Sequence, residues 1–264
     1  LSYRVMHNDI DYHQLGKKSF ATTFRHHTGE IAYSNVWLRN FRFGMGVKYD
    51  LYDYGRFLHQ VGNEGFEVNN EHFFSYFANL HYETYDNAYF PSKGVRFHSS
   101  YSLNTDNFLE YEDDTPFSIV SGSFEWVVPV THRFALLPSV RGRLIFGKNI
   151  PFSKMNVMGG DTGEQYLTDQ LPFIGTNSVE LMDNSLLIGG LKLRQRIGGI
   201  HYLTLAGNYA RSSHKIKNIL REESMFGCAI TYGMDSMFGP LEASLNYTNH
   251  SDNVGFYINL GYKF

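Results

Sequence analysis

The stretch that decides the fold closes the chain and reads Asn253-Val254-Gly255-Phe256-Tyr257-Ile258-Asn259-Leu260-Gly261-Tyr262-Lys263-Phe264. Every second residue from 256 to 264 is apolar or aromatic, and the residues between them are mixed. Because successive side chains of a strand point to opposite faces, this pattern predicts a strand with one apolar face and a terminal aromatic. Such a strand fits a membrane-spanning sheet or the edge of a soluble β-sandwich.

The same alternation recurs along the whole chain. In residues 133–146, for example, Phe134, Leu136 and Val140 face one way, while Arg141 and Arg143 face the other. Roughly 12 strands of about 10 to 14 residues result, a length that suits a tilted membrane strand better than a soluble one. We expect two or three strands in 1–40, and the others at 41–51, 73–85, 94–104, 117–130, 133–146, 184–197, 200–211, 223–234, 241–248 and 253–264.

Composition narrows the class of protein further. The chain has 264 residues, a net charge of −3, and 19 Tyr and 22 Phe, which suits the aromatic girdles of a membrane sheet. No apolar run approaches the roughly 18 residues of a transmembrane helix. The near-neutral charge gives no indication of nucleic-acid binding. The single cysteine, Cys228, excludes an internal disulfide, and its apolar neighbours predict a packing role.

The connections between expected strands differ in length. Residues 131–132, 198–199 and 249–253 are short, whereas 53–71, 104–115, 147–183 and 212–222 are long and polar. Short periplasmic turns that alternate with long outer loops are typical of outer-membrane proteins. We therefore predict one all-β domain over residues 1–264, an antiparallel transmembrane β-barrel of about 12 strands with lipid around it.

One turn carries a resemblance to a known family. It reads Asp86-Asn87-Ala88-Tyr89-Phe90-Pro91-Ser92-Lys93-Gly94, and a strand follows at once. This D-x-x-x-F-P-x-x-G pattern, with Asp86, Phe90, Pro91 and Gly94 as its fixed positions, resembles the bacterial surface antigen superfamily. That superfamily contains the 16-stranded barrels of outer-membrane assembly factors, two-partner secretion transporters and patatin-like phospholipases. Eight expected strands follow the turn, as in that family, and Gly239-Pro240-Leu241 resembles its penultimate strand.

The resemblance implies a lid loop at about residues 147–183, folded into the barrel lumen. Gly159 and Gly160 match the family's paired glycines, but Gln165 stands where assembly factors carry a buried arginine, followed by Tyr166. A neutral amide cannot form the same charge-assisted pairing. The continuation through Pro172 and Phe173 is more similar to the barrels of Bacteroidetes-type patatin-like phospholipases.

Charged residues on the inward faces of the expected strands form a second candidate feature. At lipid-facing positions each would cost about 2 to 4 kcal/mol, so we expect them to face the lumen and dock the lid loop. An anion-selective path is the alternative. This lumen charge network comprises Arg96, Glu125, Arg141, Arg143, Lys192, Arg194 and Arg196, with Glu83, Asp161, Glu164 and Asp169 as further partners.

Signals for an enzyme or a metal site are weak. A patatin-type lipase needs a G-x-S-x-G nucleophile elbow, and this chain has none, so we expect no catalytic residue here. Neighbouring His26 and His27 point to opposite faces of a strand and do not share an ion. The acidic run Glu110, Glu112, Asp113 and Asp114 suits a solvated loop better than a cation site. We expect no metal and no cofactor.

The function implied by the resemblance is an outer-membrane barrel, in a Gram-negative bacterium, that anchors and displays or exports a patatin-like lipase domain outside this chain. The alternatives are an assembly-factor-like translocation barrel and a stand-alone pore or barrel phospholipase. Tyr262 and Phe264 would be the signal read by the outer-membrane assembly machinery. A homodimer is possible, and we expect no nucleic-acid partner. The start at Leu1 lacks a signal peptide, which fits a mature, trimmed or partial chain.

Overall fold

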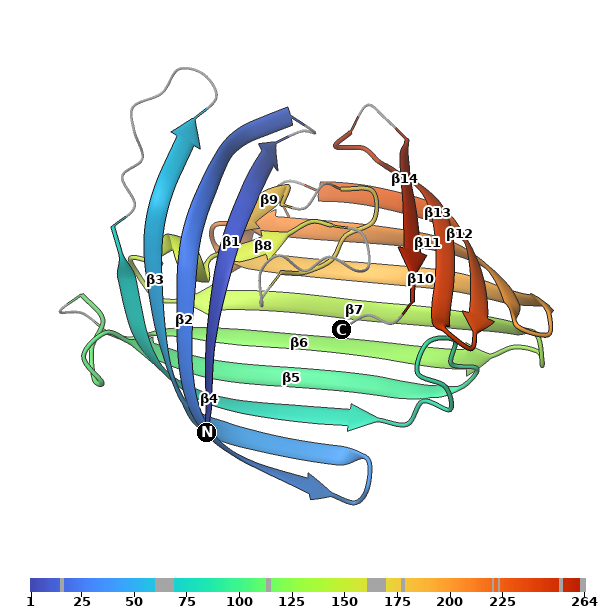
Figure 1. Ribbon diagram of the computed structural model, residues 1–264, viewed down its shortest axis with the longest axis horizontal. Helices are drawn as coiled ribbons and strands as arrows, with labels where there is room; N and C mark the ends of the chain where they lie inside the picture. The colour runs from blue at the N-terminus through green and yellow to red at the C-terminus, as the bar shows by residue number, and fades with distance from the viewer. Residues whose placement is uncertain are drawn as a thin grey trace.

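The computed structural model describes residues 1–14, 17–59, 69–112, 115–160, 170–176, 179–219, 221–222, 224–251 and 254–261 (Figure 1). Twelve strands form one antiparallel sheet in which each strand pairs with its neighbour along the chain, which confirms the predicted all-β architecture. The strands are β1 (Ser2–Gln14), β2 (Lys17–Trp37), β3 (Phe41–His59), β4 (Glu71–Glu83), β5 (Gly94–Thr105), β6 (Phe117–Pro129), β7 (Phe134–Phe146), β10 (Ser185–Gly198), β11 (His201–Ser213), β12 (Ser224–Ser236), β13 (Gly239–Thr248) and β14 (Gly255–Leu260).

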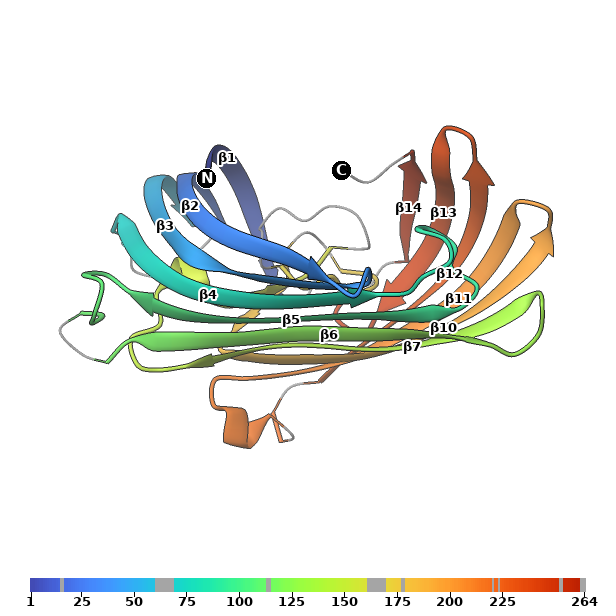
Figure 2. The same ribbon diagram turned by 90° about the horizontal axis from the view of Figure 1, so that it is seen from below.

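The sheet curves strongly but does not close (Figures 1 and 2). Its two edges are β1 and β14, and in the described part of the chain they are not paired with each other. The prediction of a closed barrel is therefore not met by these residues. We call the concave side of the sheet its inner face and the convex side its outer face.

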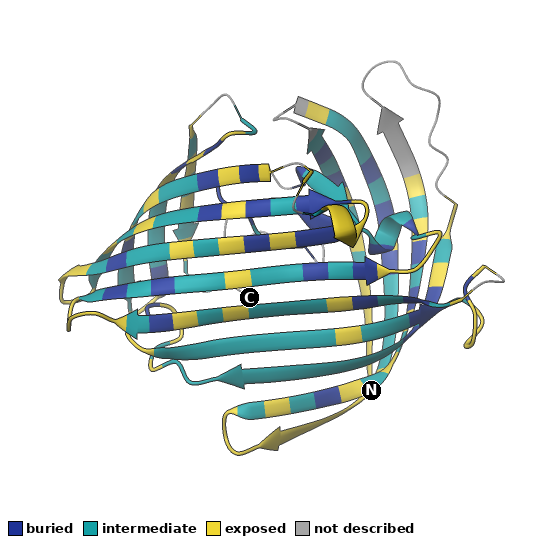
Figure 3. Ribbon diagram, turned by 180° about the vertical axis from the view of Figure 1, so that it is seen from behind, coloured by how far each residue is buried: buried dark blue, intermediate teal, exposed yellow. Residues whose placement is uncertain are grey.

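Period-2 alternation assigns side chains to the two faces, as expected. Along β6, Val120, Phe124 and Trp126 are 38–48% exposed on the outer face, while Ile119 and Val127 are buried on the inner face. Figure 3 shows this banding along several strands. An exposed apolar surface that extends over neighbouring strands indicates contact with an apolar environment, as lipid would provide.

The inner face is less polar than the sequence pattern predicted. At one end of the sheet a buried cluster contains several large apolar and aromatic side chains, with Tyr12 stacked on Phe20 at a centroid distance of 4.2 Å. They are buried because the connection between β7 and β10 covers them. The cluster comprises Ile10, Tyr12, Phe24, Tyr52, Phe73, Tyr111, Phe117, Ile119, Ile145, Val157 and Val179.

The β7–β10 connection contains three short elements, η1 (Phe152–Lys154), β8 (Asn156–Met158) and β9 (Leu181–Asp183). It lies within the trough of the sheet (Figure 2). Strands β8 and β9 pair with each other, and Val179 forms a bridge to Tyr12 of β1. Residues 161–169, which include Gln165, Tyr166 and the acids of the predicted lid loop, lie outside the described residues.

Most short connections lie at one end of the sheet and most long connections at the other, with a few exceptions. The turns at 38–40, 130–133, 199–200 and 237–238 share one end with the longer turn 84–93, which we call the short-turn end. The other end, the long-connection end, carries 60–70, 106–116, 147–184 and 214–223. The connections 15–16 and 249–254 are short but lie at the long-connection end, because the strict up-and-down order places them there.

Among the described residues, no helix is long and apolar enough to cross a membrane.

Candidate functional site

The turn at residues 84–93 is built around the carboxylate of Asp86. The backbone N–H groups of Ser92 and Lys93 donate to its Oδ1 at 2.7 and 3.2 Å, and the Ser92 hydroxyl donates to Oδ2. Partial desolvation, the largest influence, opposes ionisation, but together these hydrogen bonds outweigh it and lower the pKa of Asp86. Gly94 closes the turn at φ +116°, where a Cβ would collide with the Thr84 carbonyl. The spacing of this motif therefore has a local physical basis.

On the inner face, Phe90 contacts a strand that is distant from the turn in sequence. Its ring is 6% exposed and stacks on Tyr202 of β11 at 4.4 Å, with an interplanar angle of 1°. The Arg194 guanidinium donates to the Pro91 carbonyl, and the Asn87 amide donates to Asp235 of β12 at 3.4 Å. The turn therefore links β4 and β5 to β10, β11 and β12 at the short-turn end.

Several polar and charged side chains surround Glu125 beside this turn; we call them the Glu125 group. The Tyr85 hydroxyl donates to Glu125 at 2.6 Å, and Arg141 lies 3.7 Å from the same carboxylate. Burial, together with the neighbouring Glu125 carboxylate, raises the pKa of Tyr85 and keeps its hydroxyl a donor. With Lys192 and Arg194, these side chains line a cavity of about 420 Å³ that is also bounded by Phe173 and Ile174 of the β7–β10 connection.

The structure divides the predicted lumen charge network into separate groups. Arg96 pairs with Glu83 at 2.8 Å and lies over the Tyr85 ring, next to the Glu125 group. Arg143 lies toward the opposite end of β7, in contact with the β7–β10 connection. Arg196 belongs to neither group, since it is exposed and donates to the Gly199 carbonyl of its own turn. The sequence analysis expected Arg196 to dock the lid loop, whereas in the structure its side chain bonds to the turn at the end of β10.

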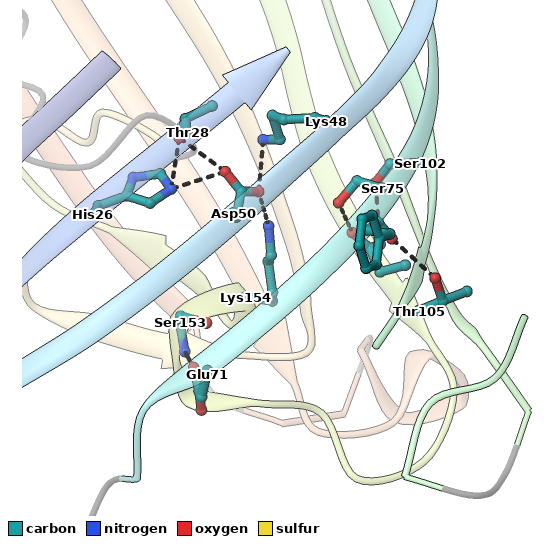
Figure 4. Close-up of polar contacts among 12 residues, drawn as sticks. His26, Thr28, Lys48, Asp50, Glu71, Ser75, Ser102, Thr105, Ser153 and Lys154 are labelled. Atoms are coloured by element: carbon teal, nitrogen blue, oxygen red, sulfur yellow. Dashed lines mark hydrogen bonds and ion pairs between the residues drawn. The ribbon is translucent and has the colours of Figure 1, made fainter. Parts of the chain in front are cut away.

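A buried ionic group that the sequence analysis did not single out surrounds Asp50 of β3 (Figure 4). Lys154 Nζ lies 2.7 Å from Asp50 Oδ2 and Lys48 Nζ lies 3.1 Å from it, while the Asp50 side chain has no solvent exposure. His26 Nε2 and Thr28 Oγ1 each lie 2.9 Å from Asp50 Oδ1. Period 2 places Lys48 and Asp50 on one face, but no sequence signal pairs them with Lys154, which lies 104 residues further along.

Arg143 extends this docking along η1 and β8. Its guanidinium donates to the Lys154 carbonyl at 3.0 Å and to the Asn156 side chain, and the Asn156 amide donates back to the Arg143 carbonyl at 2.8 Å. The Lys154 ammonium also lies 5.1 Å from the centre of the Phe73 ring. The start of the β7–β10 connection is thus held on the inner face by the buried polar contacts of Lys154, Arg143 and Asn156.

The two flanks of residues 161–169 are bonded to each other. Gln170 donates to the Gly159 carbonyl at 2.8 Å, and the Phe173 N–H donates to the Gly160 carbonyl at 3.1 Å. Beyond them, the connection rests on β12, where a Cβ on Gly227 would overlap the Ile174 carbonyl. Pro172 and Phe173 line the cavity beside Glu125. The glycine pair and the Pro172-Phe173 segment therefore lie on opposite flanks of one docked connection.

The remaining candidates give no assembled site. Tyr262 and Phe264 lie outside the described residues, as do Asp113 and Asp114 of the acidic run. Glu110 and Glu112 are exposed, and in the described ranges no cluster of three His, Cys, Asp or Glu side chains has the arrangement to hold a metal ion.

Comparison with known proteins places this architecture in a family. The family model of the OMP85 superfamily matches residues 2–264. No functionally curated protein matches the sequence. Among solved structures, the fold is similar to BamA from Haemophilus ducreyi lacking POTRA domains 1–3, with a TM-score of 0.61, 14% identity and 97% of this chain covered. The chain spans 56% of the length of that structure. Since the family model covers nearly all of it, the chain belongs to the OMP85 superfamily and is a β-sheet protein of the Gram-negative outer membrane.

Proposed function

We propose that this chain forms most of the wall of an outer-membrane barrel through which polypeptide crosses or enters the membrane. Membership in the OMP85 superfamily supports this class of function. The single observation that carries it is the β7–β10 connection, which is docked on the inner face and occupies the trough. The closed barrel, and the role of this connection as its internal lid, are parts of the proposal.

The chemistry of the docking supports a connection with one defined position. A buried ion pair gives little net stability compared with apolar packing of the same volume, because both charges lose their hydration. Its benefit is specificity, since Asp50 accepts only correctly placed donors. A lid fixed in this way has a single closed position and can leave it at modest cost.

Depletion of the full-length protein in its own host tests this function. We expect the amounts of other outer-membrane proteins, or of one secreted polypeptide, to fall as the protein is lost. Quantitative proteomics of the outer membrane and the medium is the measurement, with re-expression of the wild type as control. An unchanged proteome in both fractions would exclude a role in insertion or translocation.

A second candidate is a barrel that anchors a patatin-like lipase domain lying outside this chain. Two sequence features favour it: the neutral Gln165 at the tip position, and the run Gln170-Leu171-Pro172-Phe173-Ile174-Gly175. The intact mass of the native protein, extracted from envelopes, and the phospholipase activity of the same envelopes test it. Loss of the protein without loss of envelope lipase activity would count against this candidate, and Gln165→Arg with gained insertion activity would favour the first.

The C-terminal strand would serve assembly in either case. We propose that Tyr262 and Phe264 form the signal that the outer-membrane assembly machinery reads. Phe264→Ala is expected to lower the amount of assembled protein, whereas Lys263→Ala, at the preceding residue of the alternating sequence, is expected to leave it unchanged. Equal amounts of both variants in the membrane would contradict this role.

A further inference from the structure

The connection between β11 and β12 folds onto the outer face, opposite to the side that holds the β7–β10 connection (Figure 2, orange). It contains the 3₁₀ turn η2 (Ile216–Asn218). The Asn218 amide donates to Glu222 at 3.1 Å, and Arg211 of β11 donates to the Glu222 carbonyl at 3.2 Å. His214 is tied to Asp183 of β9 at 3.1 Å. These bonds give the connection a defined shape on the outer surface.

An apolar groove lies between this connection and the sheet. A 3₁₀ turn has three residues per turn, so Ile216 and Ile219 lie on the same side of it, and both line the groove. The groove has a volume of about 490 Å³. Its other wall is formed by outer-face side chains of β5, β6, β7 and β10, namely Phe97, Val120, Phe124, Val140, Leu144 and Leu187.

Basic residues lie next to Ile216 and Ile219 along the chain. Lys215, Lys217 and Arg221 are exposed on the connection that covers it, and together with Arg211 they outnumber Glu222 and Glu223. The Glu222 carboxylate is already engaged by Asn218. An apolar slot beside an excess of cations matches an amphiphile with an acyl chain and an anionic headgroup.

We propose that this groove binds a phosphate-bearing lipid of the outer leaflet, with one acyl chain along Val120, Phe124 and Ile216 and its phosphates on Lys215, Lys217 and Arg221. The outer leaflet follows from the long-connection end, since long connections face the cell exterior in outer-membrane proteins. The groove is continuous with the apolar outer surface of β5, β6, β7 and β10, so an acyl chain enters it from the surrounding lipid. The lipid of that leaflet in Gram-negative bacteria is lipid A, which carries two phosphates.

Native mass spectrometry of the full-length protein in detergent tests the site, with lipid A, dephosphorylated lipid A and phosphatidylglycerol as separate probes. Lipid A is expected to bind most tightly. Lys215→Gln with Lys217→Gln should weaken lipid A binding about fivefold per lysine, because each cation near an anionic surface contributes roughly that factor. Ile216→Asn with Ile219→Asn should lower the binding of all three lipids.

Lys18→Gln is the matched control, since Lys18 is an exposed lysine at the same end of the sheet but on β2. Heat-modified mobility on gels confirms that each variant is folded. Equal binding of lipid A by the lysine variant and the wild type, or equal binding of phosphatidylglycerol and lipid A, would overturn the proposal. A dimer that disappears in the isoleucine variant would overturn it as well, because a second copy would then cover the groove.

Discussion

At the scale of single residues, Asp86 gives the turn at 84–93 a defined pH dependence. Its pKa is lowered in the fold, so its contribution is complete above the ordinary aspartate value of about 3.9 and is lost as the pH falls through the lower folded value. We expect the amides of Ser92 and Lys93 to lose protection from hydrogen exchange in that acidic range. Asp86→Asn should show fast exchange already at pH 7, with little further change on acidification.

Exchange rates corrected for intrinsic pH dependence provide the measurement. Asp106→Asn is the control, because Asp106 accepts the Glu112 N–H in a different connection at the other end of the sheet. A variant at Asp86 that kept wild-type protection at pH 7 would show that the carboxylate does not hold the turn.

Also at the residue scale, Lys154 is expected to matter more than an exposed lysine of the same connection. Lys154→Met leaves Asp50 buried with a partner removed, which should cost about 3 kcal/mol, the low end of the range, because Lys48 remains. Lys148→Met, at an exposed position, should change the free energy of unfolding by less than about 0.5 kcal/mol. Denaturant titration in detergent measures both, and equal effects would contradict the role of the buried pair.

At the scale of elements, the turn at 84–93 connects strands that are far apart in the sequence. Phe90→Ala removes a ring that is stacked on Tyr202, and we expect a loss of about 3 kcal/mol together with loosened contacts to β11 and β12. Tyr89→Ala, at an exposed neighbour, should have a small effect. Chemical denaturation gives the stability, and hydrogen exchange of β11 and β12 gives the local effect. If Phe90→Ala changed hydrogen exchange only within residues 84–93, the turn would not stabilise β11 and β12.

At the scale of the whole molecule, the proposed lid role of the β7–β10 connection is tested by fixing that connection in place. Tyr12 and Val179 face each other in a β-bridge, so Tyr12→Cys with Val179→Cys, in a Cys228→Ser background, should fix the connection to β1. If polypeptide passes through the barrel, this disulfide should block passage, and a reductant should restore it. The double variant kept reduced throughout is the control. Full transport in the oxidised form would show that the connection stays in place during function.

Most of the sheet could be predicted from the sequence, since alternation is local. The runs around Phe124 and Val140 place their side chains on the outer face, as period 2 requires. The turn motif could also be predicted from the sequence, because Asp86 and Gly94 act within nine residues of each other. The Asp50–Lys154 pair could not be predicted, because it depends on how a long connection folds across the trough. The open edges could not be predicted either, since closure depends on curvature and strand number.

The strict neighbour-to-neighbour order of the strands has a kinetic consequence. Apart from β7 and β10, which the long connection 147–184 joins, neighbouring strands are separated by shorter connections and can pair early, because the entropy lost on closing a loop grows with its length. The contacts of Lys154 with Asp50 and of Arg194 with Pro91 span 104 and 103 residues. They require several finished hairpins on both sides. These two contacts are therefore expected to form last in assembly, and their formation would indicate that the sheet is complete.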